Sequence, residues 1–444
     1  MALQAILLLC QYRMLSALYE TSASLWHLVG MAARMCFELG MHRESTYKTS
    51  QQSQSGDFRD LDEASEIKRR CFWSIFALDR IASITLGRPL AINLDDIDTE
   101  LPQVGQVQGT SPDAPLLSSD TFDSPQWQSR TAIFVHITRY RAICGKILSS
   151  LHNVTRSRID SGYDYTNVRE GFRQELETWY RDIDILPLVD SGVPKSQDRS
   201  SFRSRNWYRM LFHNAILMLY RPSSTFQDSL QTSPILLRIF ESAQQSIAAY
   251  AYLHGTRKIN YSWVTLHAVF IAGLSYIYAV RSHFQTRRLQ LTWNTGQSGA
   301  NSGAHLPSDP SVMTIVNDTR ACSTVLVAVS ERWTSARNCH VVFGRLSDAI
   351  LADVVDFHTK SNQSPQVSRV QQSHNTSNAE SASVAFTDTG AQGDPFSFST
   401  NLATTYQDCF NDVNQLYNED YYNEAAMQVS QDWLYHIQAL DEVF

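Results

Sequence analysis

Apolar residues recur at helical spacing through most of this chain, and that periodicity restricts the fold more than any other feature. Side chains three and four residues apart lie on one face of an α-helix, so each run predicts a helix with one buried face. No convincing strand alternation interrupts these runs. The sequence therefore predicts an all-α, multi-helix fold. The runs lie within 25–39, 67–82, 133–151, 168–183, 207–218, 235–247, 263–284 and 322–333.

Polar stretches that contain glycine, proline and serine separate the predicted helices. Gly40 follows the first run where a left-handed cap would end a helix, and Pro222 disfavours helical backbone at Arg221. We expect one helical domain over 1–357, followed by a disordered tail over 358–444. The predicted loops within the domain lie at about 45–60, 103–125 and 285–312.

Two apolar stretches have some features of membrane or targeting segments. Residues 263–280 barely reach spanning length, and Thr265, His267 and Ser275 interrupt them. Residues 1–14 lack a positive leading region and a convincing cleavage site. We therefore expect a central buried helix at 263–280, an amphipathic helix at 1–14, and no membrane partner.

The net charge of −7 is unevenly distributed along the chain. Every lysine and arginine lies at or before Arg369, whereas residues 370–444 contain eleven acidic residues and no basic one. The tail therefore carries −11 and the remainder +4. A near-neutral body with an acidic tail is not typical of a nucleic-acid-binding domain, which presents a clustered basic face.

The cysteines predict neither a disulfide framework nor a metal site. All seven are scattered, and no two have C-x-x-C spacing. Such a set is typical of buried free thiols in a reducing compartment. No phosphate-binding or hydrolase motif appears either, so the sequence provides no candidate catalytic, cofactor-binding or metal-ligating residue of these kinds.

The end of the tail interleaves acidic residues with aromatic ones between Asp394 and Phe444. Acidic neighbours keep aromatic side chains solvated and available to a partner, which is typical of an activation segment that contacts the transcription machinery or a coactivator. An alternative is a C-terminal helix that docks back on the protein's own body. The candidate contact residues are Trp433, Leu434, Ile437 and Leu440.

A cluster of carboxylates follows the predicted helix at 67–82, in the segment LGRPLAINLDDIDTELP (86–102). Helical Mg²⁺-dependent enzymes of the isoprenoid-synthase type place aspartates on facing helices. The Asp95–Asp98 cluster, with residues 411–419 as a second motif, would fit that class only weakly. The cluster lies between two prolines without a helical apolar stripe, so a loop is the favoured interpretation.

The segment 66–102, EIKRRCFWSIFALDRIASITLGRPLAINLDDIDTELP, closely resembles the signature of the fungal-specific transcription factor domain, the middle regulatory region of fungal zinc-cluster transcription factors. Segments 25–44, 212–223 and 263–278 are also similar to parts of that family. The signature residues, which we expect to be structural, are Arg70, Trp73, Asp79, Arg80, Gly87, Arg88, Pro89, Asp96, Asp98 and Pro102.

The resemblance implies a nuclear regulator of transcription by RNA polymerase II, often of one metabolic pathway, without enzymatic activity. The family's zinc cluster and its basic flank are absent from this sequence, so zinc and DNA binding would require a cluster upstream. A homodimer and a non-DNA-binding interaction protein that modulates other regulators are both compatible with these residues.

The residues of the signature also predict a local contact. Gly87 and Pro89 end the helix, and we expect Arg88 to pair with a carboxylate from 95–98 and so fix the path of the loop. Breaking a partly buried pair from one side would cost about 3 kcal/mol.

Overall fold

The computed structural model describes residues 1–15, 21–48, 58–103, 125–152, 164–188, 201–221, 232–293, 303–331 and 336–362. Within these ranges every regular element is helical, which confirms the all-α prediction. Short 3-10 turns are η2 (Leu94–Asp96), η4 (Asp182–Ile185) and η5 (Ser201–Arg203), and η3 (Leu148–His152) is a π-helical turn. The α-helices are α1 (Ala2–Leu15), α2 (Thr21–Glu38), α3 (Ser45–Lys48), α4 (Phe58–Leu86), α5 (Pro125–Ile147), α7 (Tyr165–Arg181), α8 (Arg205–Tyr220), α9 (Ser233–Gly255), α10 (Trp263–Trp293), α11 (Val312–Ser330) and α12 (Ala336–Asn362).

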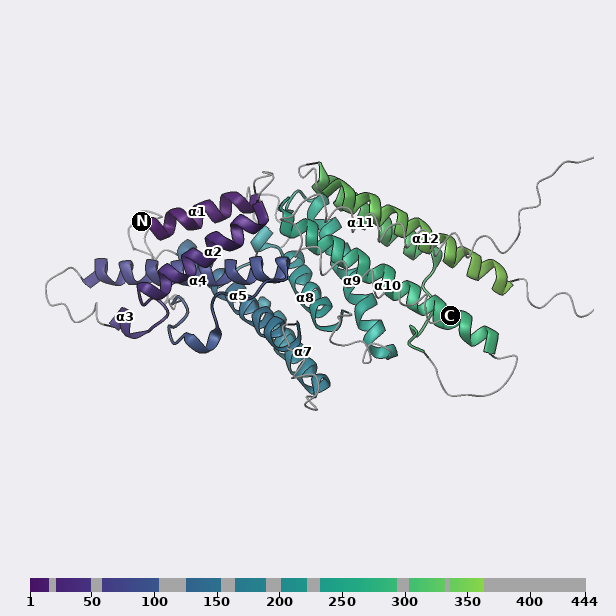
Figure 1. Cartoon of the computed structure of the whole chain (residues 1–444), viewed down its shortest axis with the longest axis horizontal. Helices are drawn as coiled ribbons and strands as arrows, with labels where there is room; N and C mark the ends of the chain where they lie inside the picture. Colours follow the sequence, from purple (N-terminus) through teal and green to yellow (C-terminus); the bar gives the residue numbers. More distant parts are fainter. Residues whose placement is uncertain are drawn as a thin grey trace, which may run out of the picture.

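The helices form an elongated array (Figure 1). Helices α1, α2 and α4 pack together at one end, and α9 to α12 pack together towards the other. Helices α5, α7 and α8 connect the two ends, because each contacts the next in turn. Two apolar clusters result: a large one that extends from Cys10 to Phe357, and a smaller one formed mainly by α1, α2 and α4.

Helix α10 lies at the centre of the large cluster, as predicted for 263–280. It contacts α8, α9, α11 and α12, and every residue from Val269 to Phe284 is buried. By length and composition α10 and α11 could each span a membrane, but 72% of the apolar window of α10 is buried inside the protein. Gly273 permits its close packing, because a Cβ there would lie 2.6 Å from Phe343 Cε2 and 2.8 Å from Cys322 Sγ.

Local sequence signals located several helix ends correctly. Gly40 and Gly87 follow α2 and α4 with φ of +67° and +61°, a left-handed conformation that glycine adopts at low cost. Helix α8 ends at Tyr220, so that Arg221 before Pro222 is no longer helical. The predicted helix at 1–14 is also present, as α1.

Other boundaries were predicted wrongly. Helix α10 continues to Trp293 through part of the loop expected at 285–312, and α4 begins at Phe58 within the loop expected at 45–60. The predicted apolar runs end at 333, whereas α12 extends to Asn362, past the predicted start of the tail at 358. The extent of the domain over 1–357 stays a prediction, and residues 363–444 lie outside the described residues.

Candidate functional site

The signature segment forms the C-terminal part of α4 and the loop that returns from it, residues 87–103. The loop is held at two places. At the first, buried charges on α4 bind the backbone of residues 91 and 92. At the second, residues 98–100 contact the turn after α2. Both places are built from the residues that carry the family resemblance.

At the first place, the carboxylate of Asp79 is completely buried and accepts hydrogen bonds from the loop backbone. The N–H of Ala91 donates to Asp79 Oδ1 at 3.0 Å, and the N–H of Ile92 donates to Oδ2 at 3.2 Å. Burial raises the pKa of Asp79, although these hydrogen bonds and Arg80 oppose that rise. The carboxylate therefore accepts hydrogen bonds from two backbone N–H groups of the loop, and the N–H of Ile92 would otherwise be buried without a partner.

Arg80 completes this buried pair. It is 1% exposed, and its Nη1 lies 3.0 Å from Asp79 Oδ2 while Nη2 donates to the Ile92 carbonyl at 2.7 Å. Its guanidinium lies 3.4 Å from the centre of the Phe76 ring. Burial lowers the pKa of Arg80 to about 10, which leaves it charged at neutral pH. Gly145 of α5 makes room for it, since a Cβ there would approach Arg80 Nε to 3.1 Å.

The turn between α4 and the loop is fixed by backbone contacts. The N–H of Arg88 donates to the Ser83 carbonyl at 2.9 Å, and Ser83 Oγ donates to the Pro89 carbonyl at 3.1 Å. The Trp26 Nε1–H of α2 reaches the same Pro89 carbonyl at 3.4 Å. The Gly-Arg-Pro stretch thus acts as a structural stop for the helix.

At the second place, residues 42–44 and 98–100 exchange hydrogen bonds. The N–H groups of Asp98 and Thr99 donate to the His42 carbonyl at 3.1 and 3.2 Å. Asp98 Oδ1 accepts from the Glu44 N–H at 2.7 Å, and Glu44 Oε2 accepts from the Glu100 N–H at 3.0 Å. Each of the two segments therefore both donates hydrogen bonds to the other and accepts hydrogen bonds from it.

Arg69 secures the second place from α4. Its Nη2 donates to Glu44 Oε1 at 3.0 Å, and its guanidinium lies 4.5 Å from the centre of the Tyr47 ring. Desolvation raises the pKa of Glu44, but the hydrogen bonds from the Glu100 N–H and from Arg69 outweigh it, so the net shift is downward. Glu44 is consequently ionised and paired at neutral pH.

The remaining signature residues lie around these contacts. Arg70 donates to Glu66 Oε1 at 2.8 Å and to Thr131 Oγ1 of α5 at 2.6 Å, which joins α4 to α5. Trp73 Nε1 donates to the Glu100 carbonyl at 2.8 Å, and Pro102 is buried beneath the end of the loop.

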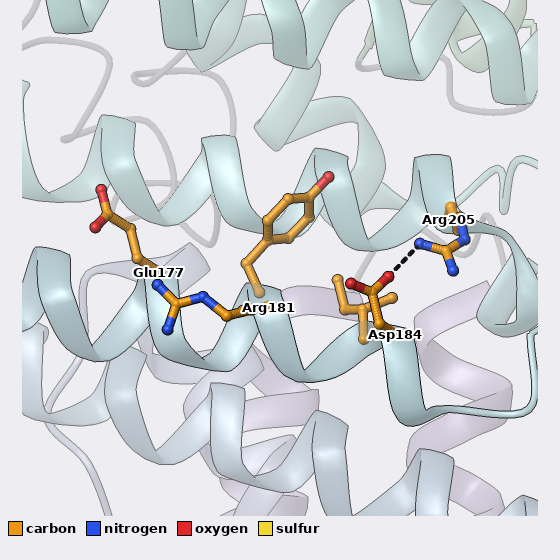
Figure 2. A pocket seen from close by; sticks show the side chains of 6 residues that line it. Glu177, Arg181, Asp184 and Arg205 are labelled. Atoms are coloured by element: carbon orange, nitrogen blue, oxygen red, sulfur yellow. Dashed lines mark hydrogen bonds and ion pairs between the residues drawn. The ribbon is translucent and has the colours of Figure 1, made fainter.

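A separate cavity of about 320 Å³ opens where α7 ends and α8 begins (Figure 2). Two carboxylates and two guanidinium groups line it, so their charges balance. Asp184 Oδ1 already lies 2.7 Å from Arg205 Nη1. The lining residues are Glu177, Tyr180, Arg181, Ile183, Asp184 and Arg205. This balanced, partly paired lining gives the cavity no strong preference for a cation or an anion.

Comparison with known proteins finds a family model that matches the helices carrying the signature. Residues 1–181, from α1 to the end of α7, match the family model described as "Fungal specific transcription factor domain". These residues, less than half of the chain, are similar to that domain. No solved structure matches the chain.

Relatives of the chain are transcriptional regulators of fungi. It is 25% identical to the "Positive regulator of purine utilization" of Emericella nidulans, over 65% of this chain and 31% of that protein. It is also 25% identical to "Pyrimidine pathway regulatory protein 1" of Saccharomyces cerevisiae, over 57% of this chain and 26% of that protein. The matches thus span between a quarter and a third of these relatives' length.

Within the matched residues 1–181, the predicted pairing of Arg88 is wrong. Its guanidinium lies 5.0 Å from the centre of the Trp26 ring, and none of the carboxylates at 95–98 pairs with it. Asp98 instead lies 3.6 Å from Arg43 Nη1, while Asp95 and Asp96 are exposed on η2. The charge that fixes the loop comes from the buried Asp79–Arg80 pair.

We expect Arg88→Ala to lower the free energy of unfolding by only about 0.5–1 kcal/mol, the usual value of a partly exposed cation–π contact. Urea denaturation followed by circular dichroism measures this loss. A loss above about 2 kcal/mol would show that Arg88 makes a stronger contact than the one with Trp26.

The magnesium alternative finds no support in the described residues. No group of three or more His, Cys, Asp or Glu side chains among them could hold a metal ion. Residues 411–419, the proposed second motif, lie outside the described ranges, as do Trp433, Leu434, Ile437 and Leu440. The described cysteines are free, and burial raises the pKa of Cys36 to about 12, which makes it a poor metal ligand or nucleophile.

Sequence reasoning missed the residues that bind the signature from outside it. Glu44, His42 and Trp26 lie in the segment 25–44, whose similarity to the family predicts no role for these side chains. Glu44 could have been found from the sequence, because it is an acidic residue in the turn that follows Gly40. The His42 carbonyl offers no such signal, because any residue supplies the same backbone acceptor.

Proposed function

We propose that this chain is the regulatory part of a fungal, pathway-specific transcription regulator that acts on RNA polymerase II genes in the nucleus. The observation that carries the proposal is the family match over α1–α7, together with the functions stated in the relatives' names. The names of two relatives refer to single metabolic pathways, of purines and of pyrimidines, which supports control of one pathway. The side chains of the signature hold the loop in place, which supports a scaffold for regulation rather than an enzyme.

The acidic tail supplies the activating element in this proposal. Residues 363–444 combine eleven acidic residues with interleaved aromatic ones, and no basic residue follows Arg369. Aromatic and aliphatic side chains kept solvated by neighbouring acids suit a hydrophobic groove of a coactivator. Trp433, Leu434, Ile437 and Leu440 are the proposed contacts.

A reporter assay tests the activating role. Residues 363–444, fused to an unrelated DNA-binding domain, should activate transcription of a reporter gene in a fungal cell. Replacing Trp433, Leu434, Ile437 and Leu440 together by alanine should remove most of that signal, because the replacement removes apolar contact area and leaves the charge unchanged. A control fusion with Gln371, Gln372, Gln392 and Gln407 replaced by alanine should keep the signal. A wild-type fusion that gives no signal, at equal protein level, would refute the activating role.

A further inference from the structure

The cavity between α7 and α8 has groups of both charges on two sides. Glu177 and Arg181, from the end of α7, lie on one side, and Asp184 of η4 lies beside Arg205 of α8 on the other (Figure 2). A volume of about 320 Å³ is at the lower end of the range for small-molecule sites, roughly 300–1,000 Å³. The cavity therefore suits a small ligand, and its four charged groups decide which kind.

Two of these groups are not fully engaged by the protein. The carboxylate of Glu177 is paired with Arg173 on the preceding turn of α7. Asp184 contacts Arg205 through Oδ1, which leaves its Oδ2 without a hydrogen bond to the described part of the chain. Arg181 is exposed and makes neither a hydrogen bond nor an ion pair with the residues that the structure describes. The cavity thus offers one guanidinium group and one carboxylate oxygen to a ligand.

Arg181 and Asp184 are placed to contact the same small molecule. Arg181 immediately precedes the 3-10 turn η4, and side chains three residues apart in such a turn lie one above the other. The two side chains do not pair with each other, because Asp184 contacts Arg205 instead. A ligand that contacts both must carry a negative group for Arg181 and a positive group for Asp184.

An α-amino acid carries these two groups on one carbon atom. Its carboxylate matches the guanidinium of Arg181, which binds carboxylates through two parallel hydrogen bonds. Its ammonium group matches Oδ2 of Asp184. The apolar part of the lining is Ile183, which is 3% exposed, and the ring of Tyr180, which packs on Phe212 with centroids 4.8 Å apart. This part suits an apolar side chain of the amino acid.

We propose that the cavity binds a free α-amino acid with an apolar side chain, in its zwitterionic form. The consequence of binding rests on the proposed regulatory function. A bound amino acid joins the end of α7 to the start of α8, and these helices, which contact each other, lie between the two ends of the array (Figure 1). Binding therefore stabilises the connection between the two ends and makes it depend on the level of the amino acid.

Isothermal titration calorimetry of the full chain at neutral pH tests the binding. At least one of L-leucine and L-phenylalanine should bind a single site with a Kd below about 1 mM. Their analogues keep the side chain but carry one charge only: 4-methylpentanoate and 3-methylbutylamine for leucine, 3-phenylpropanoate and 2-phenylethylamine for phenylalanine. Each analogue should bind at least about tenfold more weakly than its amino acid, because one charged group of the cavity is left without a partner.

Two variants assign the charges to residues. Arg181→Gln removes the partner of the carboxylate and should weaken binding of the amino acid at least about tenfold. Asp184→Asn should weaken the amino acid by a similar factor but should not weaken the carboxylate analogue, a difference that general damage to the fold does not produce. Its ion pair with Arg205 is exposed, so the melting temperature should change little. Arg320→Gln, at an exposed arginine of α11 outside the cavity, is the matched control and should bind like the wild type.

Three results would overturn the proposal. One is the absence of saturable binding of either amino acid up to about 10 mM. Another is a carboxylate analogue that binds as tightly as its amino acid, which would make the cavity an anion site. The third is unchanged binding in Arg181→Gln with an unchanged melting temperature, which would place the amino acid elsewhere. The reporter fusion contains neither α7 nor α8, so its failure and the failure of this binding are separate results.

Discussion

Replacing Asp79 with alanine should lower the free energy of unfolding by about 3–5 kcal/mol, because it leaves the buried Arg80 charge without its partner. The same change removes the acceptor for the N–H groups of Ala91 and Ile92, and Ile92 is completely buried. Urea denaturation gives the loss directly. Hydrogen exchange should in addition show faster exchange at residues 91 and 92 in the native state.

Two variants place this loss in context. Asp79→Asn keeps an acceptor of the same shape and should fall between the wild type and Asp79→Ala. Arg43→Ala breaks the ion pair with Asp98, whose side chains are 52% and 55% exposed, and should cost under about 1 kcal/mol. If Asp79→Ala unfolds at the same urea concentration as Arg43→Ala, the buried pair does not stabilise the loop as described.

The contrast between Asp79 and Arg88 shows that the sequence predicted the position of the signature residues on the helix but not the partners of their side chains. Helix periodicity placed both residues near the end of α4, and Gly87 marked that end correctly. The sequence did not reveal the partners, because Asp79 binds backbone N–H groups that every residue type possesses. Arg88 was assigned to the nearest carboxylates, yet Asp98 is engaged by the turn after α2, a contact between segments 54 residues apart.

Helix α12 shows a different limit. Its buried residues Cys339, Val342, Phe343, Leu346 and Ile350 have helical spacing, so the signal was present in the sequence. The last predicted apolar run nevertheless ends at Trp333, which lies outside the described residues. Which face of α10 receives α11 and α12 depends on Gly273, and a glycine in an apolar run does not by itself show which neighbour approaches it.

The free energy of unfolding should fall as the pH drops from 6.5 towards 4, because several wholly or partly buried histidines are neutral in the folded protein. Desolvation lowers the pKa of His136 and of His213 to about 4 and that of His152 to about 3. Desolvation also lowers the pKa of His283, which is completely buried. In the unfolded chain these groups titrate near 6.5.

The sign follows from proton counting. Between the two pKa values the unfolded chain binds more protons than the folded one, so acid favours unfolding. Each histidine contributes a slope of about 1.4 kcal/mol per pH unit once the pH is well below 6.5. Burial raises the pKa of Asp79 and Glu66, which take up protons more readily when folded and so oppose part of this trend.

A phenylalanine at position 136 isolates one of these contributions. The His136 ring stacks on Trp179 with centroids 4.8 Å apart, and its Nε2 makes no hydrogen bond, so phenylalanine preserves the contact and removes the titration. Urea denaturation at intervals from pH 7.5 to 4.5 should show a slope smaller by about 1.4 kcal/mol per pH unit in His136→Phe. His213→Phe, whose Nδ1 also lacks a hydrogen bond, should reduce the slope by a similar amount, and the two reductions should add. A wild-type slope in His136→Phe, with stability retained at pH 7.5, would mean that His136 is protonated in the fold and that acid acts elsewhere.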